Sequence, residues 1–200
     1  AARDLFVSLG VKSIDARQDG AKIGEGPRES WLFNATFAGV NKADAILIIG
    51  SNPRIEAPVL NARIRQHWLA SDVKIGVVGE DADLTYPAEH LGADPSALKS
   101  LLKAKSGFMK TLKEAERPLI LIGAGAIARE DGAQVLRLAG EIAKSAGAVR
   151  EDWNGFSVLH AAASRVGALD LGDLAVSLLH DRAHVGPVLV VGLLGVAPAG

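Results

Sequence analysis

The sequence predicts an α/β protein built on a doubly wound, Rossmann-like parallel sheet. Short apolar runs alternate with glycine-containing turns and longer amphipathic stretches, the order expected of parallel strands joined by crossover helices. The apolar runs are continuous rather than alternating, which is typical of strands covered by helices on both faces. With 200 residues, 48% hydrophobic and 22% charged, the chain is long enough to bury such a core.

Four apolar runs are predicted to form the main strands: Ala45–Ile49, Val73–Val78, Pro118–Ile122 and Pro187–Val191. Residues 148–150 are a candidate for a short strand, and residues 11–16 for an edge strand. Helices are predicted over Ser30–Val40, Ala57–Ala70, Ser96–Lys105, Asp131–Ala146 and Phe156–Leu169. Within the second of these, Leu60, Ile64 and Trp68 recur at a spacing of four residues, which places them on one inward face.

The remaining stretches are predicted to be connections. Residues 15–29 and 80–95 are rich in acidic residues, glycine and proline, and both are expected to be loops. A lobe boundary is expected between residues 105 and 118, so that residues 1–105 form a first α/β lobe and residues 106–200 a second. The chain lacks a starting methionine, and we expect it to be a fragment of a longer protein.

Charge and cysteine content exclude several classes of function. The net charge of −1 argues against a nucleic-acid-binding protein and against a polybasic membrane-surface protein. The absence of cysteine excludes disulfides, a thiolate nucleophile and Cys-ligated iron–sulfur clusters within these residues. No apolar stretch reaches the roughly 18 residues that a membrane-spanning helix needs, so no direct membrane insertion is expected.

The first candidate site is the turn formed by Gly50, Ser51, Asn52, Pro53 and Arg54, directly after the first main strand. Ligands of open α/β sheets bind at the carboxyl ends of strands. A glycine there permits close approach of the backbone, and the serine and asparagine side chains can hydrogen-bond a nucleotide or phosphate. The alternative is a strand-to-helix turn that binds nothing, because every α/β protein needs such turns.

The second candidate is the segment from Gly123 to Ala128, which follows the third main strand and matches a loose dinucleotide-binding fingerprint. Its backbone N–H groups are placed to cradle a pyrophosphate at a helix start, with Glu151 or Asp152 as partner for a ribose hydroxyl. The acids lie further along the chain than the fingerprint requires. Close packing of a helix against a strand explains the same glycines.

Two groups of basic residues have weaker functional interpretations. Arg63, Arg65 and His67 lie close together on one predicted helix. They face an acidic partner subunit or a phosphate, or else form a solvated face. His180 and His184 have the spacing of two metal ligands on one helical turn, but no third ligand is evident. No Ser–His–Asp set can be assembled, and no catalytic residue is predicted.

From Ser30 to Gly172 the sequence resembles the large iron–sulfur subunit of respiratory NADH–quinone oxidoreductases. The resemblance is carried by long segments and not by short motifs: residues 30–40, 43–65, 83–86, 90–92, 131–133, 158–160 and 168–172. After Gly172 the family pattern fades, so the tail over residues 173–200 is not assigned.

The resemblance implies a fold and a role. The C-terminal half of this family is similar to molybdopterin oxidoreductases, in which a Gly-x-Asn-Pro turn lies near the guanine nucleotide of the cofactor. Gly50, Asn52 and Pro53 match that turn, and Gly50 to Arg54 are therefore expected to be a vestigial cofactor site. In the respiratory subunit this half is expected to be a scaffold without cofactor, metal or catalytic residues.

The parent subunit is implied to carry 4Fe-4S and 2Fe-2S clusters on cysteines elsewhere in its chain. It is implied to bind other peripheral-arm subunits, on the cytoplasmic side of the bacterial inner membrane or the matrix side of the mitochondrial one. Two alternatives remain open. One is a molybdopterin oxidoreductase domain that still binds its nucleotide cofactor through Gly50 to Arg54. The other is the central domain of a thiamine-diphosphate enzyme, which the segment from Arg117 to Gly125 resembles.

Overall fold

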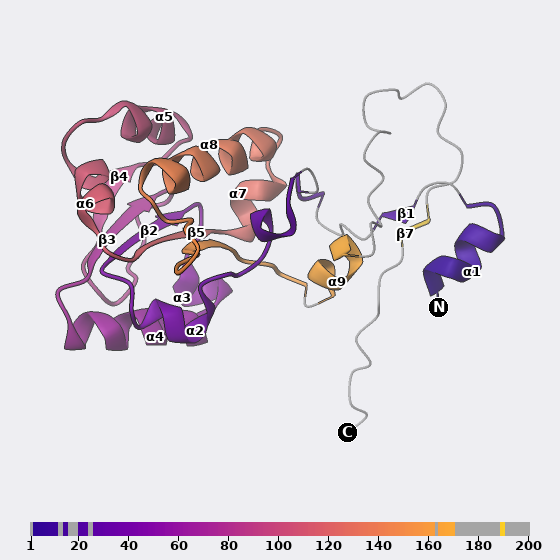
Figure 1. Cartoon of the computed structure of the whole chain (residues 1–200), viewed down its shortest axis with the longest axis horizontal. Coiled ribbons are helices and arrows are strands. Elements are labelled where there is room, and N and C mark those ends of the chain that lie inside the picture. The colour runs from indigo at the N-terminus through magenta and orange to yellow at the C-terminus, as the bar shows by residue number, and fades with distance from the viewer. Residues whose placement is uncertain are drawn as a thin grey trace. The chain divides into compact units, whose positions relative to one another are not determined.

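A computed structural model of the chain describes residues 2–11, 14–15, 20–23, 26–162, 164–170 and 189–190 (Figure 1). The chain divides into two compact units. One unit comprises residues 21–161, and the other comprises residues 1–20 together with residues 162–200. The three strands predicted between residues 45 and 122 all lie in the unit of residues 21–161.

That unit is built on a five-stranded sheet in the order β4-β3-β2-β5-β6, and every neighbouring pair is parallel. The strands are β2 (Ala45–Ile49), β3 (Lys74–Val78), β4 (Glu89–Gly92), β5 (Pro118–Ile122) and β6 (Phe156–Val158). The predicted parallel α/β fold is therefore confirmed. The three strands predicted over residues 45–49, 73–78 and 118–122 are confirmed almost to the residue.

β2 lies at the centre of the sheet. It pairs in register with β3 on one side, Ala45 opposite Lys74, and with β5 on the other, Ala45 opposite Pro118. The chain runs outward from β2 through β3 to β4, then returns to add β5 and β6 on the opposite side. The boundary between β2 and β5 is thus the point at which the winding direction reverses.

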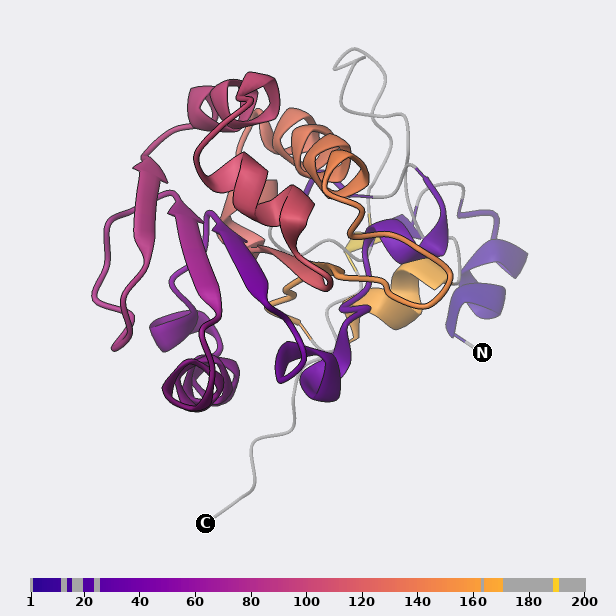
Figure 2. The same cartoon turned by 60° about the vertical axis from the view of Figure 1, so that its left-hand side comes forward.

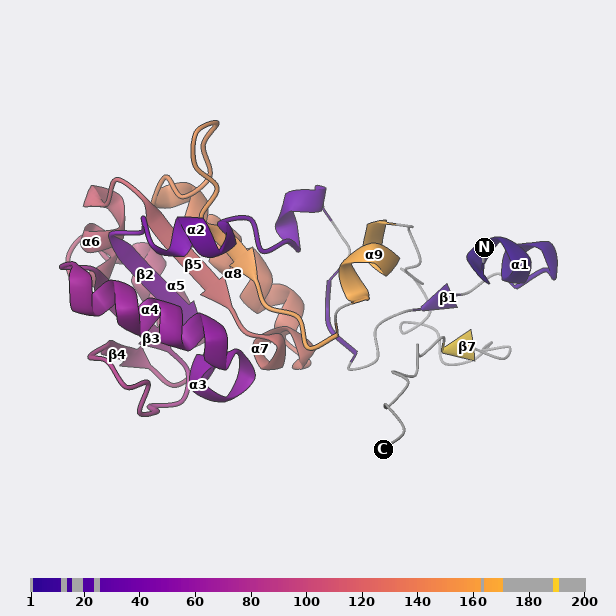
Figure 3. The ribbon, with the colours of Figure 1, turned by 90° about the horizontal axis from the view of Figure 1, so that it is seen from below.

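Helices cover both faces of the sheet (Figures 1, 2 and 3). One layer holds α2 (Thr36–Val40), α3 (Pro53–Glu56) and α4 (Pro58–Ala70). The opposite layer holds α5 (Ser96–Lys103), α6 (Phe108–Glu114), α7 (Ala124–Ala128) and α8 (Gly132–Ser145). A short 3-10 helix, η1 (Arg28–Ser30), precedes α2.

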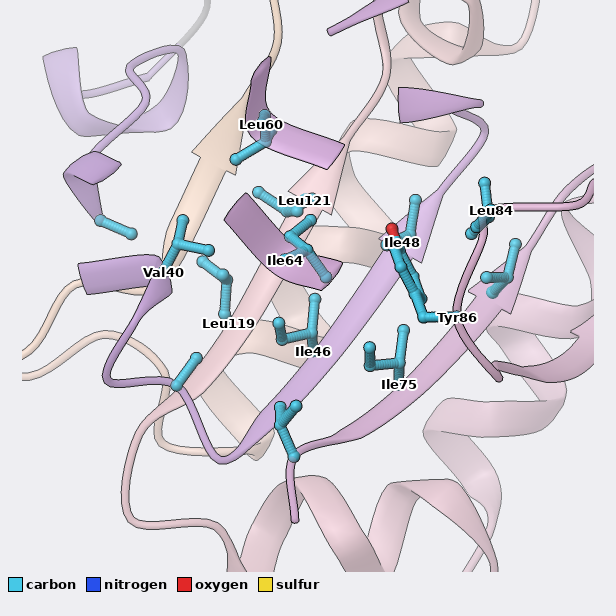
Figure 4. Packing of buried hydrophobic residues seen from close by; sticks show 14 residues of the cluster. Val40, Ile46, Ile48, Leu60, Ile64, Ile75, Leu84, Tyr86, Leu119 and Leu121 are labelled. Carbon is cyan, nitrogen blue, oxygen red and sulfur yellow. The ribbon is translucent and has the colours of Figure 1, made fainter. Parts of the chain in front are cut away.

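Alternate residues of the strands form two cores, one on each face. Toward α4, Ile46, Ile48, Leu119 and Leu121 pack against Leu60 and Ile64 in a single buried cluster (Figure 4). The inward face predicted for α4 is confirmed, since Leu60 is 3% exposed, Ile64 is fully buried and Trp68 packs against the cluster. At about 25 cal/mol per Å² of apolar surface, burial of this kind is the main stabilising term.

The other face is closed by α8 and α6. Val135, Leu138 and Ile142 of α8 are buried, as their helical spacing predicts. Phe108 lies directly over β3, where Gly76 leaves room for it: a Cβ at Gly76 would be 2.8 Å from the Phe108 ring. The predicted helices over residues 96–105 and 131–146 are confirmed as α5 and α8.

Several sequence-based predictions are wrong in this unit. Residues 156–158 are strand β6 and not the start of a helix, whereas Val149, proposed as a strand, makes only an isolated antiparallel bridge to Asn154. The helix predicted from Ser30 to Val40 is shorter, because α2 begins only at Thr36.

Two segments predicted as loop or boundary contain regular structure. The loop predicted over residues 80–95 contains the edge strand β4, and the proposed boundary region contains α6. The division into residues 1–105 and 106–200 stays a prediction. Strands from both ranges lie side by side in the one sheet.

The unit formed by both ends of the chain contains α1 (Ala2–Ser8), β1 (Ile14–Asp15), α9 (Arg165–Asp170) and β7 (Leu189–Val190). β1 pairs in parallel with β7 in a two-stranded sheet of their own. Parts of the segments predicted as strands over residues 11–16 and 187–191 are therefore extended, but neither joins the main sheet. His180 and His184 lie outside the described residues, as does most of the unassigned tail.

None of the helices within the described ranges has both the length and the apolar character that crossing a membrane demands.

Candidate functional site

The two turns singled out in the sequence meet at the carboxyl edge of the sheet. Gly50 to Arg54 follow β2, and Gly123 to Ala128 follow β5, the two strands between which the winding direction reverses. In doubly wound folds this is where ligands bind. The fold thus places both candidate motifs at one position.

Backbone hydrogen bonds hold this corner together. The Gly123 N–H donates to the carbonyl of Ile49 at 2.9 Å, and the Gly50 N–H donates to the carbonyl of Val78 at 2.7 Å. Gly50 has φ of 55°, in the left-handed region that glycine adopts without steric cost. The sheet pairing therefore continues one residue beyond each strand before the chain turns.

The turns are packed too closely to admit side chains at the glycines. A Cβ on Gly123 would lie 2.3 Å from the Gly50 carbonyl oxygen and 2.6 Å from Cβ of Ser51. A Cβ on Gly50 would lie 2.5 Å from Cβ of Ala126 in α7. The corner between β2 and β5 is therefore filled by the chain's own backbone and small side chains.

Asn52 and Pro53 start a helix. The Asn52 side-chain oxygen accepts a hydrogen bond from the Arg54 N–H at 3.2 Å, the usual contact of an N-cap residue. The Asn52 N–H in turn donates to the Glu56 carboxylate at 3.1 Å. Pro53 occupies the first helical position, where its missing N–H costs nothing. The Asn-Pro pair thus has a local structural role.

Arg54 ties this turn to the connection between β3 and β4. Its guanidinium donates to the Asp83 carbonyl at 3.1 Å and pairs with the Asp83 carboxylate at 2.7 Å. The pair is exposed, with 50% of the Arg54 and 78% of the Asp83 side chain accessible. The Arg54–Asp83 pair lies in solvent, where an ion pair contributes little to stability.

The Asp83 carboxylate also accepts a hydrogen bond from the Thr85 N–H at 2.9 Å. This bond, followed by the hydrogen bond and charge of Arg54, lowers the pKa of Asp83 below its ordinary value. Thr85 has φ of 71°, which is unfavourable for a β-branched residue. The bond from Thr85 to Asp83 therefore holds a strained turn in place.

A buried polar network joins the same turn to α4. The Asn61 amide donates to the Leu84 carbonyl at 3.1 Å, and the Tyr86 hydroxyl donates to the Asn61 side-chain oxygen at 2.8 Å. Burial raises the pKa of Tyr86. Sequence reasoning missed Asn61. The sequence does contain an indication of its burial: Asn61 is next to Leu60 and three residues before Ile64, on the apolar face of the helix.

The basic residues of α4 do not form one cluster. A ring nitrogen of His67 is 2.6 Å from the Ala43 carbonyl oxygen, so this side chain fastens α4 to the start of β2. Arg65 donates to the Thr85 carbonyl at 3.2 Å. Arg63 is half-buried and makes no ion pair within the described part of the chain.

The acids proposed for a ribose contact lie at the wrong edge of the sheet. Glu151 and Asp152 precede β6, whereas Gly123 follows β5, so they lie at opposite ends of the parallel strands. Asp152 pairs with Arg150 at 3.3 Å in a turn anchored at the start of β5 by the Trp153 ring N–H, which donates to the Pro118 carbonyl. The dinucleotide interpretation of residues 123–128 is therefore wrong in this respect.

The corner fits a nucleotide cofactor poorly. The carbonyl oxygen of Gly50 lies against Gly123 at the start of α7. The side-chain oxygen of Asn52 and the guanidinium of Arg54 are both engaged within the protein. Ser51 Oγ is the one buried polar side-chain atom of the turn without a hydrogen-bond partner.

Two hollows in the described structure lie elsewhere. One, of about 630 Å³, lies near the amino ends of β2 and β3 and includes Asp44 and Lys74 in its lining. The other, of about 400 Å³, lies beside α2 and the start of α4. Residues 50–54 line neither of them. No group of three or more potential metal ligands gathers within the described ranges.

Comparison with known proteins assigns the family. A model of the molybdopterin oxidoreductase family matches residues 1–198. The chain belongs to the molybdopterin oxidoreductase family. This assignment covers the segment from Arg117 to Gly125, for which a thiamine-diphosphate enzyme was the sequence-based alternative.

Relatives of the chain are subunits of NADH dehydrogenase or NADH–quinone oxidoreductase. The chain is 40% identical over 172 residues to NADH dehydrogenase (ubiquinone) iron-sulfur protein 1, mitochondrial, of Solanum tuberosum, covering 86% of the chain and 23% of that protein. It is 44% identical over 147 residues to the mitochondrial NADH-ubiquinone oxidoreductase 78 kDa subunit of Neurospora crassa, covering 72% and 20%. It is 38% identical over 174 residues to an NADH-quinone oxidoreductase subunit of Rickettsia bellii, covering 86% and 26%.

These matches confirm the resemblance to the large iron–sulfur subunit of NADH–quinone oxidoreductase. The chain spans between 20% and 26% of the length of these relatives.

Gly123→Ala tests how closely the turns at Gly50 and Gly123 are packed. The added methyl meets the Gly50 carbonyl, and we expect a loss of about 3 kcal/mol of unfolding free energy, at the upper end for overpacked sites. Gly140→Ala is the matched control, because Gly140 lies in α8 with nothing within 4 Å, and it should gain about 0.5–1 kcal/mol. Urea unfolding measures both, and equal midpoints would contradict the packing described.

The Asp83 carboxylate should titrate below its ordinary pKa in the folded protein. Its interactions with Thr85 and Arg54 stabilise the fold when it is ionised, and this contribution is lost as the pH falls through the lowered pKa, below about pH 4. Carboxyl NMR titration measures the shift. In Arg54→Gln the pKa should rise but stay below the ordinary value, since the Thr85 N–H remains. A titration of Asp83 unchanged by this substitution would refute the pairing.

Proposed function

We propose that this chain is part of the large iron–sulfur subunit of NADH–quinone oxidoreductase, the enzyme that passes electrons from NADH to quinone coupled to proton translocation. Within that subunit it acts as a scaffold that binds no cofactor of its own. The support for the parent protein is the 38–44% identity to subunits named for NADH dehydrogenase or NADH–quinone oxidoreductase in Solanum tuberosum, Neurospora crassa and Rickettsia bellii.

The corner between β2 and β5 carries the proposal of a scaffold. Gly50 and Gly123 are in backbone contact at the position where a doubly wound fold would open its ligand crevice. Asn52 caps α3, and Arg54 is held by Asp83. A turn whose polar groups are used to fix helices supports a purely structural role for Gly50 to Arg54.

Electron transfer in such a subunit is then the task of other segments. The chain has no cysteine, and iron–sulfur clusters are held by cysteine thiolates. The 4Fe-4S and 2Fe-2S clusters expected of the parent subunit would be bound outside these residues. The other peripheral-arm subunits are the proposed partners. The proposed location is the cytoplasmic face of the bacterial inner membrane, or the matrix face in mitochondria.

Assembly tests the proposed parent protein. When tagged in its native cells, the protein should co-sediment with NADH–quinone oxidoreductase activity. Gly123→Ala should reduce the amount incorporated because the scaffold is destabilised, whereas Gly140→Ala should assemble normally. Migration of the tagged protein apart from this activity under every extraction condition would rule the proposal out.

One observation favours a second candidate, a domain that retains a nucleotide cofactor: the buried Ser51 Oγ has no hydrogen-bond partner. Thermal unfolding with GMP and GDP distinguishes the two functions. A ligand that binds only the folded state, at a concentration one hundred times its dissociation constant, raises the free energy of unfolding by about 2.7 kcal/mol. For a scaffold we expect no change in melting temperature at millimolar nucleotide, with ATP as the control. A shift specific to guanine nucleotides and lost in Asn52→Ala would establish the second candidate instead.

A further inference from the structure

The two helical layers of the unit formed by residues 21–161 differ in what they expose. Large apolar side chains are exposed on the layer of α2, α3 and α4: Phe37 at 47%, Ile55 at 77%, Val59 at 70% and Leu69 at 61%. Among the described residues, no large apolar side chain is exposed on the helices of the opposite layer. That layer presents charges instead, including the ion pairs from Lys110 to Glu114 and from Arg137 to Glu141.

The exposed face of α4 is continuous. Val59, Ala62, Gln66 and Leu69 follow one another at spacings of three and four residues, which places them in a single stripe along the helix. All four are exposed. Three of these four residues are apolar, and the inward stripe of α4 is apolar too. The helix therefore lacks the polar outer face of a fully solvated helix. Figure 3 shows α4 along the outside of the domain, beside α2 and α3.

An apolar hollow adjoins the start of this stripe. It has a volume of about 400 Å³, and its lining includes Phe33, Phe37, Pro58, Val59 and Leu159. The rings of Phe33 and Phe37 lie against each other, with centroids 6.1 Å apart. A concave apolar surface next to a convex apolar stripe is typical of a protein interface, in which a side chain of the partner enters the hollow.

The charges on α4 have one sign. The helix contains arginine and histidine but neither aspartate nor glutamate. Arg63 and Arg65 have no carboxylate partner among the residues that the structure describes, in contrast to Arg54, which pairs with Asp83. Carboxylates on a docking surface would complement these two guanidinium groups and fix its orientation.

We propose that Phe37, Ile55, Val59 and Leu69, together with Arg63 and Arg65, form a docking surface, the α4 face. Its partner is a neighbouring subunit of the assembly whose contact surface is apolar and bordered by carboxylates. This inference rests on the proposed function, since it requires the chain to lie in a multi-subunit enzyme.

Photo-crosslinking in the assembled enzyme tests the α4 face. Benzoylphenylalanine is incorporated in place of Val59 or Leu69, both exposed, so the core is undisturbed. The matched controls carry it in place of Lys99 on α5 or Gln134 on α8, which are exposed on the opposite layer. We expect a crosslink to one other subunit from both α4 positions and from neither control. We also expect its loss in Arg63→Glu/Arg65→Glu, with assembly maintained by the remaining contacts of the subunit.

Co-sedimentation of each variant with the enzyme activity is measured first. Failure of the unsubstituted protein to co-sediment overturns the proposed function and this inference together. If it co-sediments, four results overturn the inference alone. These are no crosslink from α4, crosslinks only within the same polypeptide, crosslinks only to lipid, or equal crosslinking from the opposite layer.

Discussion

The backbone contact between Gly50 and Gly123 is the constraint on which this domain depends. β2 and β5 are neighbours at the centre of the sheet, and the chain leaves both at the same edge. Because neither turn carries a side chain at the point of contact, α7 can start directly against the loop that leads to α3. Helices on opposite faces of the sheet are thereby positioned from one corner, at the place where related folds open a crevice.

Much of this architecture is visible in the sequence. Residues 45–49 and 118–122 are uninterrupted apolar runs, a composition typical of strands covered on both faces. The missed strands lack this feature. Glu89 and His90 of β4 are exposed and its other two residues are only half-buried, so no apolar run marks this strand. β6 has three residues, too few for any periodicity, and its strand conformation comes from pairing with β5.

The position of the candidate site can be predicted from the sequence, but the roles of its side chains cannot. The rule that ligands bind at strand ends locates Gly50 to Arg54 correctly at the reversal of the sheet. What the side chains do there depends on tertiary partners. Asp83, which holds Arg54, comes from a loop beyond the next strand, and the contacts of Asn61 are made to that same loop. Only the capping by Asn52 is local, and the Asn-Pro sequence is a sufficient indication of it.

The central place of β2 has a consequence for how the domain is made on the ribosome. β2 is translated before either of its neighbours, and β5 follows only after β3, β4, α5 and α6. Until then one edge of an entirely apolar strand has unpaired N–H and carbonyl groups, a surface prone to aggregation. The nascent chain therefore has a period of vulnerability that ends when Pro118–Ile122 leaves the exit tunnel, and chaperones would be needed most before that point.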